Sequence, residues 1–241
     1  MKNVQIIIQA RMTSTRLPGK VMLPLCNSSV LQTMLERLPN LHDNIIIATT
    51  NDGSESPIIE LCKNLNIKYF RGETDDVLGR YYYAAKQFGA NEKTTIVRLT
   101  SDCPLIDEAL CLRVINKHLC GDYDIVSLGP HSGYPRGLDC CAFSFNLLSN
   151  THQKATLPAD REHVTLGMTK FNEVSSYIFS ALEDLSHLRL TLDEQDDYTA
   201  IKQIYGKFGN KTDFSYSELI KTLKKFPELT DINKHVEQKN V

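Results

Sequence analysis

The sequence predicts an α/β fold in which a mostly parallel β-sheet is covered by helices. From the N-terminus to about residue 120, short apolar runs typical of strands alternate with segments of helical spacing. A β-α-β-α order of this kind builds parallel sheets with right-handed crossovers. The run Ile45-Ile46-Ile47 is apolar at every position, which suits a strand buried on both faces.

The first half of the chain supplies four expected strands and four expected helices. The strands are expected at 4–9, 44–50, 67–70 and 95–99, and the helices at 31–38, 57–65, 75–88 and 107–119. Ser56 is the expected N-cap of the second helix, with Pro57 at its first position. Asp75 and Asp76 open the third helix, where acids suit the helix dipole, and Asp107 is expected to cap the fourth.

The pattern changes after a strand expected at 123–127. Residues 129–139 are rich in glycine, proline and polar side chains and are expected to form a loop. Further strands are expected at 140–145, 174–179 and 188–192, and helices at 146–151, 160–170, 196–208 and 216–225. The polar tail 233–241 is expected to fray. The sequence contains no internal repeat, so we expect one domain over 1–241 with an inserted acceptor-binding or dimerisation lobe at 129–180.

Composition restricts the class of ligand and the compartment. The 241 residues carry a net charge of −2, so no overall basic field points to nucleic acid. No apolar run approaches the roughly 18 residues that span a bilayer, and the N-terminal strand leads straight into polar residues, unlike a signal peptide. These features predict a cytoplasmic protein that binds no membrane. The 7 cysteines include no CxxC pair and are expected to be mostly buried hydrophobic residues.

A basic loop follows the first expected strand. Three cations, Arg11, Arg16 and Lys20, are spaced around the hydroxyl residues of Thr13-Ser14-Thr15. Ligands in open α/β sheets bind beyond the carboxyl ends of the strands, which is where this loop lies. Arginine forks and a lysine charge suit a polyphosphate, although the loop lacks the Walker pattern. On charge and position alone, a solvated basic loop remains the alternative.

The loop and several later blocks resemble one family. The blocks are Ala10-Arg11-Met12-Thr13-Ser14-Thr15-Arg16-Leu17-Pro18-Gly19-Lys20, Phe70-Arg71-Gly72-Glu73, Asp76-Val77-Leu78, Arg80-Tyr81-Tyr82, Thr100-Ser101-Asp102-Cys103-Pro104-Leu105-Ile106-Asp107, Tyr134-Pro135-Arg136-Gly137-Leu138-Asp139, Arg161-Glu162-His163-Val164 and Leu188-Arg189-Leu190-Thr191-Leu192-Asp193. Together they resemble the spore-coat polysaccharide cytidylyltransferase-like (SpsF-type) family. Acylneuraminate and Kdo cytidylyltransferases are its more distant relatives.

This resemblance implies a fold, a reaction and an assembly. The fold is the Rossmann-like, GT-A-like fold of nucleotide-diphospho-sugar transferases. The reaction is transfer of CMP from CTP to a sugar or sugar phosphate with release of pyrophosphate, for a surface glycan. A guanylyl or other nucleotide specificity in the same family stays open. The resemblance also implies a homodimer.

Two aspartates are the candidate metal ligands. Asp102 follows the expected strand 95–99 and therefore faces the ligand crevice, and Mg²⁺ prefers one or two carboxylates with phosphate oxygens. The resemblance implies Asp193 as its partner. The alternative for Asp102 is a turn residue before Pro104. Arg11 and Lys20, with the two aspartates, are the candidate catalytic residues.

The candidate nucleotide contacts come from the ends of four expected strands. They are Ala10, Arg11, Met12, Thr13, Ser14, Arg16, Lys20, Thr49, Arg71 and Thr100. Most of these positions follow from the resemblance. It places Arg71 at the base, and cytosine offers acceptors that an arginine can bind. An ordinary surface position is the equal alternative for Arg71.

The candidate acceptor contacts lie in the second half of the chain. They are Tyr134, Arg136, Asp139, Arg161, Glu162, His163 and Arg189. Arg136 and Arg161 have the charge to bind a carboxylate or phosphate on the sugar, and His163 has the chemistry of a general base. Structural alternatives stay open for His163 and Arg189: a hydrogen-bonding histidine and an ion pair with a nearby acid.

A glycosyltransferase that uses a nucleotide sugar is the alternative activity. Such enzymes share the sheet and the metal-bound diphosphate, but they commonly carry a D-x-D pair. The corresponding block here, Ser101-Asp102-Cys103-Pro104, has no second acid at that spacing. A non-catalytic nucleotide-sugar binder is a third interpretation.

Overall fold

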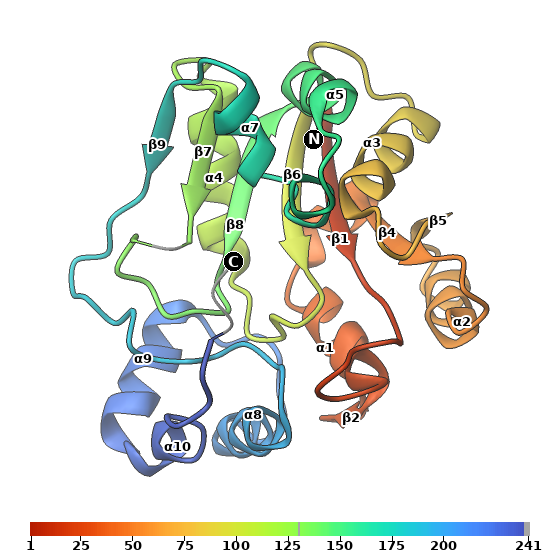
Figure 1. Ribbon diagram of the computed structural model, residues 1–241. Coiled ribbons are helices and arrows are strands. Elements are labelled where there is room, and N and C mark those ends of the chain that lie inside the picture. Colours follow the sequence, from red (N-terminus) through yellow and green to blue (C-terminus); the bar gives the residue numbers. More distant parts are fainter. Residues whose placement is uncertain (130, 239–241) are drawn as a thin grey trace.

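A seven-stranded sheet crosses the molecule in the order β5-β4-β1-β6-β8-β7-β9 (Figure 1). The structure is a computed structural model that describes residues 1–129 and 131–238. The strands are β1 Val4–Gln9, β4 Ile45–Thr50, β5 Lys68–Gly72, β6 Thr95–Thr100, β7 Ile125–Leu128, β8 Cys140–Ser144 and β9 Ser176–Ile178, with a separate small ribbon of β2 Pro24–Leu25 and β3 Ser28–Ser29. β5, β4, β1 and β6 are parallel, and β8 runs antiparallel to both of its neighbours. The predicted α/β fold with a mostly parallel sheet is confirmed.

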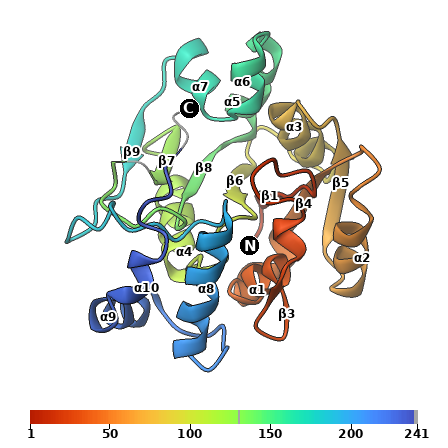
Figure 2. The same ribbon diagram turned by 60° about the horizontal axis from the view of Figure 1, so that its bottom comes forward.

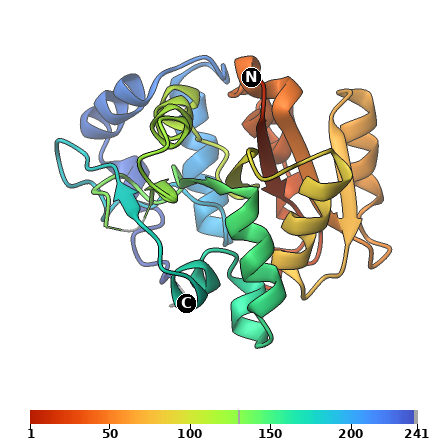
Figure 3. The ribbon, with the colours of Figure 1, turned by 90° about the horizontal axis from the view of Figure 1, so that it is seen from above.

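Helices cover both faces of this sheet. They are α1 Val30–Glu36, α2 Ser56–Asn64, α3 Val77–Gln87, α4 Glu108–Leu119, α5 Phe145–Lys154, α6 Pro158–Glu162, α7 Leu166–Phe171, α8 Gln195–Lys207, α9 Tyr216–Lys225 and α10 Glu228–Asp231, with short 3-10 helices at Lys20–Met22 and Pro39–Asn44. α1, α2 and α4 pack on one face, and α3, α5 and α7 on the other. The view from above shows α3 and α5 opposite α4 (Figure 3). None of the helices in the described ranges is long and apolar enough to cross a membrane.

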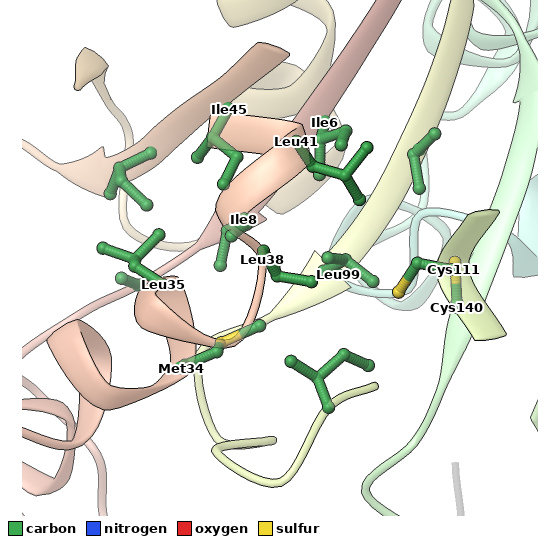
Figure 4. Close-up of a cluster of buried hydrophobic side chains, with 14 of the residues drawn as sticks. Ile6, Ile8, Met34, Leu35, Leu38, Leu41, Ile45, Leu99, Cys111 and Cys140 are labelled. Atoms are coloured by element: carbon green, nitrogen blue, oxygen red, sulfur yellow. The ribbon is translucent and has the colours of Figure 1, made fainter. Parts of the chain in front are cut away.

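Strands β1 and β4 are apolar on both faces. On β1, Ile6 and Ile8 point into the cluster under α1 and α4, while Ile7 points into the cluster under α3. This alternation follows from the two-residue period of a strand. Figure 4 shows Ile6 and Ile8 packed with Ile45, Leu38 and other side chains of the first cluster. The Ile45-Ile46-Ile47 strand is therefore buried on both faces, as predicted.

The site is positioned by the carboxyl ends of β1 and β6, which lie side by side. Gln9 at the end of β1 is in register with Thr100 at the end of β6, so the loops after both strands leave the same edge. The C-terminal helices form a third apolar cluster that includes Val30 of α1 and Leu190 and Leu192. Figure 2 shows α8 lying next to α1 at this edge.

Several predicted elements differ from the structure. The helix expected at 160–170 is two helices, α6 and α7, because the backbone at His163 is not helical and the buried Val164 inserts into the core between them. No strand forms at 188–192; a single bridge joins Arg136 and Arg189. The α5 helix is longer than the expected 146–151.

Two predicted helix and tail features are also corrected. The N-cap of α2 is Glu55, not Ser56, since the buried Glu55 carboxylate accepts the Gly53 N–H and holds this turn. The tail expected to fray is anchored at Asn233, which is 1% exposed and donates hydrogen bonds to Arg189 and Asp197. Residues 239–241 of that prediction lie outside the described residues. The lobe boundaries 129–180 stay a prediction; β8, inside that range, is an interior strand of the main sheet.

Candidate functional site

The loop after β1 is closed on itself by backbone hydrogen bonds. The Gly19 N–H donates to the Met12 carbonyl at 2.8 Å, and the Met22 N–H donates to the Gly19 carbonyl at 2.8 Å. Gly19 has φ 69°, in the left-handed region that glycine adopts without a steric penalty. This turn brings Lys20, at the start of the short 3-10 helix, back toward the carboxyl ends of the strands.

A cavity of about 780 Å³ opens at this edge of the sheet. Its walls include many of the predicted site residues: Ala10, Arg11, Ser14, Arg16, Lys20, Thr100, Asp102, Glu162, His163 and Asp193. Residues from the first strand, from the 3-10 helix, from β6 and from the segment before α8 therefore share one space. The predicted basic loop therefore lies in the wall of this cavity.

Lys20 bridges the two aspartates that were predicted to hold a metal. Its Nζ donates to Asp102 Oδ2 at 3.1 Å, to Asp193 Oδ1 at 2.9 Å and to the Leu192 carbonyl oxygen at 2.7 Å. Burial by itself would lower the pKa of Lys20, but attraction by Asp102 and Asp193 outweighs it and leaves that pKa raised. Lys20 is therefore a cation held between two carboxylates.

Asp193 is held by three cations. Besides Lys20, Arg16 contacts its Oδ2 at 3.1 Å and Arg189 contacts the same oxygen at 2.8 Å. Burial acts to raise the pKa of Asp193, but the charges of Lys20, Arg16 and Arg189 together lower it. The carboxyl group consequently stays ionised at any pH near neutral, as a metal ligand requires.

A buried aspartate fixes the segment that carries Asp193. Asp197, which is fully buried, accepts hydrogen bonds from the backbone N–H groups of Asp193 and Glu194 at 2.9 and 3.0 Å. It also pairs with Arg189 Nε at 2.8 Å. Arg189 pairs with both Asp193 and Asp197, so it forms the structural ion pairs that were its alternative interpretation.

Asp102 and Asp193 meet because their two segments are hydrogen-bonded to each other. The Leu192 N–H donates to the Asp102 carbonyl at 2.7 Å, and Thr191 Oγ1 donates to the same carbonyl at 3.2 Å. The Asp102 side chain also accepts from Cys103 Sγ at 3.6 Å. Burial of Cys103 raises the pKa of its thiol well above the ordinary value, so it acts as a weak hydrogen-bond donor and not as a nucleophile.

The donor set fits a divalent cation that also binds a substrate. Two carboxylates within hydrogen-bond distance of one Nζ match the preference of Mg²⁺ for one or two carboxylates, with phosphate oxygens and water as further ligands. Within residues 1–129 and 131–238, no group of three or more metal-binding side chains forms a cage made of protein alone. The arrangement therefore favours a metal shared with a phosphorylated ligand.

Five of the seven predicted acceptor residues line two cavities, and Arg161 and Arg189 line neither of them. Tyr134, Arg136 and Asp139 line a second cavity of about 450 Å³, whereas Glu162 and His163 line the main one. Burial raises the pKa of Asp139, although the Gly137 N–H and the charges of Arg136 and Arg98 act against this rise. The charge of Asp102 also raises the pKa of Asp139, so the second cavity lies within electrostatic range of Asp102.

Arg161 and Arg71 are engaged by acids outside the main cavity wall. Arg161 forms a two-point ion pair with Asp76, with contacts of 2.9 and 2.6 Å, and lines a separate acidic cavity beside the main one. Arg71 pairs with the buried Glu55. Three other predicted nucleotide contacts, Met12, Thr13 and Thr49, also do not line the main cavity. Their roles in binding stay predictions.

Sequence reasoning missed several polar residues of the main cavity wall, among them Gln9, Arg80 and Arg98. Each of these three has a buried side-chain atom without a hydrogen-bond partner, Gln9 Oε1, Arg80 Nε and Arg98 Nε. Gln9 is the last residue of β1, and Arg98 lies two residues before the end of β6. A polar residue next to the carboxyl end of an otherwise apolar strand was the available signal.

Comparison with known proteins gives one consistent family. The family model described as cytidylyltransferase matches residues 5–225. The spore coat polysaccharide biosynthesis protein SpsF of Bacillus subtilis is 32% identical over 240 residues, which cover 95% of this chain and 97% of that protein. A cytidylyltransferase structure from Leptospira borgpetersenii matches with a TM-score of 0.89 and 32% identity, over 99% of both chains.

A partial match extends to a second group of enzymes. The 3-deoxy-manno-octulosonate cytidylyltransferase of Francisella philomiragia is 32% identical over 109 residues, which cover 44% of this chain and 42% of that enzyme. The predicted resemblance to the SpsF-type family, with Kdo cytidylyltransferases as more distant relatives, is confirmed.

Proposed function

This chain belongs to the cytidylyltransferase family, and we propose that it transfers CMP from CTP to a sugar or sugar phosphate and releases pyrophosphate. The observation that carries this proposal is the meeting of Lys20, Asp102 and Asp193 at the wall of the main cavity. Cationic side chains that suit a triphosphate lie there beside two acids that suit its metal. The relatives named for polysaccharide biosynthesis support a product destined for a surface glycan.

The reaction needs positioning and charge stabilisation more than acid–base chemistry. An acceptor oxygen forms a bond to the α-phosphorus of CTP, the bond between the α-phosphorus and the bridging oxygen breaks, and pyrophosphate leaves with that oxygen. Arg11, Arg16 and Lys20 would hold the triphosphate and then the departing pyrophosphate. Asp102 and Asp193 would hold Mg²⁺, whose chemistry is to neutralise charge on the phosphate oxygens.

The acceptor contacts belong to the same proposal. His163 lies in the main cavity wall, and we propose it as the group that takes the proton of an acceptor hydroxyl. Tyr134, Arg136 and Asp139 would bind the remainder of the acceptor from the second cavity. The compartment proposed for this enzyme is the cytoplasm, where CTP is available.

Homodimerisation through the lobe at 129–180 is a further part of the proposal. Leu157, Leu166 and Ile178 in this range are 56%, 45% and 45% exposed, which is unusual for large apolar side chains. Sedimentation velocity would give twice the 27.3 kDa mass of the chain if the proposal is correct.

Pyrophosphate release from a panel of nucleoside triphosphates tests the activity. With Mg²⁺ and candidate sugar acceptors, we expect release from CTP and little from ATP, GTP or UTP. A parallel incubation with nucleoside-diphosphate sugars tests the glycosyltransferase alternative. Hydrolysis or transfer from such a sugar, with no release from any triphosphate, would refute the proposal.

The first prediction concerns Asp102. We expect Asp102→Asn to lower kcat by about 10²–10³-fold, because it removes one of two carboxylates from the proposed metal site. CTP binding, measured by isothermal titration calorimetry, should largely survive. Asp122→Asn is the control, because Asp122 pairs with Lys117 on an exposed surface away from the cavity. A kcat equal to that of the unmodified enzyme would remove Asp102 from the mechanism.

A further inference from the structure

Lys20 occupies the position that the two metal acids would offer to a cation. An ammonium group has three N–H donors. All three have acceptors here: Asp102 Oδ2, Asp193 Oδ1 and the Leu192 carbonyl. With its donors saturated and its side chain only 11% exposed, Lys20 has no free donor for a phosphate. The ammonium must leave these acceptors before it can bind a triphosphate.

The Asp102 and Asp193 carboxylates need a cation between them, both without and with a bound triphosphate. Two acids that share one bridging atom repel each other strongly when that atom carries no positive charge. Asp193 keeps Arg16 and Arg189 as additional partners, but Asp102 has Lys20 as its one ion-pair partner among the described residues. A divalent cation and the Lys20 ammonium therefore compete for the same pair of oxygens.

We propose that Lys20 fills the metal position of the ligand-free protein and gives it up only when a triphosphate supplies replacement oxygens for its ammonium. The nucleotide draws Lys20 away, and the vacated acids then accept the divalent ion. Metal and nucleotide consequently strengthen each other's binding. The identity of the triphosphate rests on the proposed function, but the competition between Lys20 and the metal does not.

This arrangement has a consequence that can be measured without turnover. In the absence of nucleotide, a divalent ion must displace Lys20, so its apparent affinity is reduced by the cost of breaking three contacts. A variant such as Lys20→Met has no ammonium to displace, so this cost disappears. The substitution also leaves the Asp102 carboxylate without an ion-pair partner among the described residues.

The test is Mn²⁺ binding to the full chain without nucleotide, measured from the electron paramagnetic resonance signal of free Mn²⁺. We expect Lys20→Met to bind one Mn²⁺ on the order of tenfold or more tightly than the unmodified protein. The gained site must disappear in the double variant Lys20→Met/Asp102→Asn. Lys170→Met is the matched control, since Lys170 pairs with Asp160 outside the cavity, and its Mn²⁺ binding should be unchanged.

Equal Mn²⁺ affinity in the unmodified protein and in Lys20→Met would overturn the proposal. Thermal unfolding shows whether Lys20→Met is folded. Lys20→Arg provides a second measurement because it keeps the positive charge, and its Mn²⁺ affinity must stay as weak as that of the unmodified protein. A tight Mn²⁺ site in Lys20→Arg would also contradict the proposal.

The two proposals fail in distinguishable ways. If CTP neither binds nor releases pyrophosphate, the proposed function fails, while the difference in Mn²⁺ affinity between the unmodified protein and Lys20→Met still stands. If CTP is turned over but the Lys20 variants bind Mn²⁺ alike, the activity stands and the competition is refuted.

Discussion

At the scale of single residues, Arg98 is a cation of the main cavity wall without an acidic partner among the described residues. It lies on β6, four residues before Asp102, and it makes no hydrogen bond or ion pair with the described residues. Placing a cation in a partly buried position without a partner is unfavourable. Its charge acts to lower the pKa of Asp139, which lines the second cavity. We therefore expect its partner to be an anionic group of the acceptor.

The prediction for Arg98 separates the two substrates. Arg98→Met should lower kcat/KM for the acceptor found in the pyrophosphate assay by about 10–100-fold, because a charged hydrogen bond is lost. CTP affinity, measured by calorimetry, should change by less than about twofold on the same reasoning. Arg98→Lys should recover part of the loss, since the charge remains. Weakened CTP binding with an unchanged acceptor KM would instead assign Arg98 to the triphosphate.

At the scale of elements, Asp76 joins the start of α3 to α6. Its carboxylate caps α3 by accepting the Gly79 N–H at 2.8 Å and binds Arg161 through both oxygens. Burial acts to raise the pKa of Asp76, but the hydrogen bonds from Arg161 and Gly79 and the charge of Arg161 lower it overall. Asp76 was predicted at the start of this helix, where it is the N-cap, and it also secures α6, which ends at Glu162 and leads into His163.

The prediction for Asp76 is a pH-dependent loss of stability. Asp76→Ala should lower the free energy of unfolding by about 1–3 kcal/mol at pH 7, through loss of the cap and the ion pair. The carboxylate of folded Asp76 has a lowered pKa, so its contribution is complete above the unfolded pKa of about 4 and is lost as pH falls below it. Urea denaturation at pH 7 and pH 3 should show a smaller difference between the two proteins at pH 3. A difference that grows on acidification would contradict this account.

At the scale of the whole molecule, Asp193 reaches Asp102 because distant segments approach closely. The Arg136 N–H donates to the Leu188 carbonyl at 3.0 Å, and the Leu190 N–H donates to the Arg136 carbonyl at 2.7 Å. Gly137 permits this approach, since it has φ 102° and a Cβ there would lie 2.4 Å from the Leu190 carbonyl carbon. The loop after β7 therefore supports the segment that carries Asp193.

The prediction for Gly137 compares it with a second glycine of similar backbone geometry. Gly53 has φ 92° and nothing within 4 Å of its Cβ position, so Gly53→Ala should cost only about 1–2 kcal/mol of backbone strain. Gly137→Ala should cost about 2 kcal/mol more and should also reduce Mn²⁺ binding in the Lys20→Met background, because Asp193 is displaced. Chemical denaturation and the Mn²⁺ assay measure both effects. Equal costs for the two substitutions would show that the close approach at Leu190 is unimportant.

The sequence by itself determined the parts of this protein that depend on local periodicity and local chemistry. The Ile45-Ile46-Ile47 run predicted a strand buried on both faces, Asp76 and Asp107 were predicted at the start of helices that they cap, and the basic loop was predicted beside Asp102. Strand period, capping and the carboxyl-end position of ligand loops are properties of neighbouring residues. The motif blocks also identified the family correctly.

Only the tertiary structure decided which charges meet. The tail that was expected to fray is anchored at Asn233 through contacts with Arg189 and Asp197. Lys20 donates hydrogen bonds to Asp102 and Asp193, the two acids that were expected to bind metal. For Arg98, the local signal was a charged residue near the carboxyl end of an apolar run, which does not tell what the side chain faces. These contacts join residues up to 173 positions apart, and the free energy that holds them comes from burial and charge pairing created by the folded chain. A charged side chain at one position is compatible with many partners, so its partner is decided only when the segments pack.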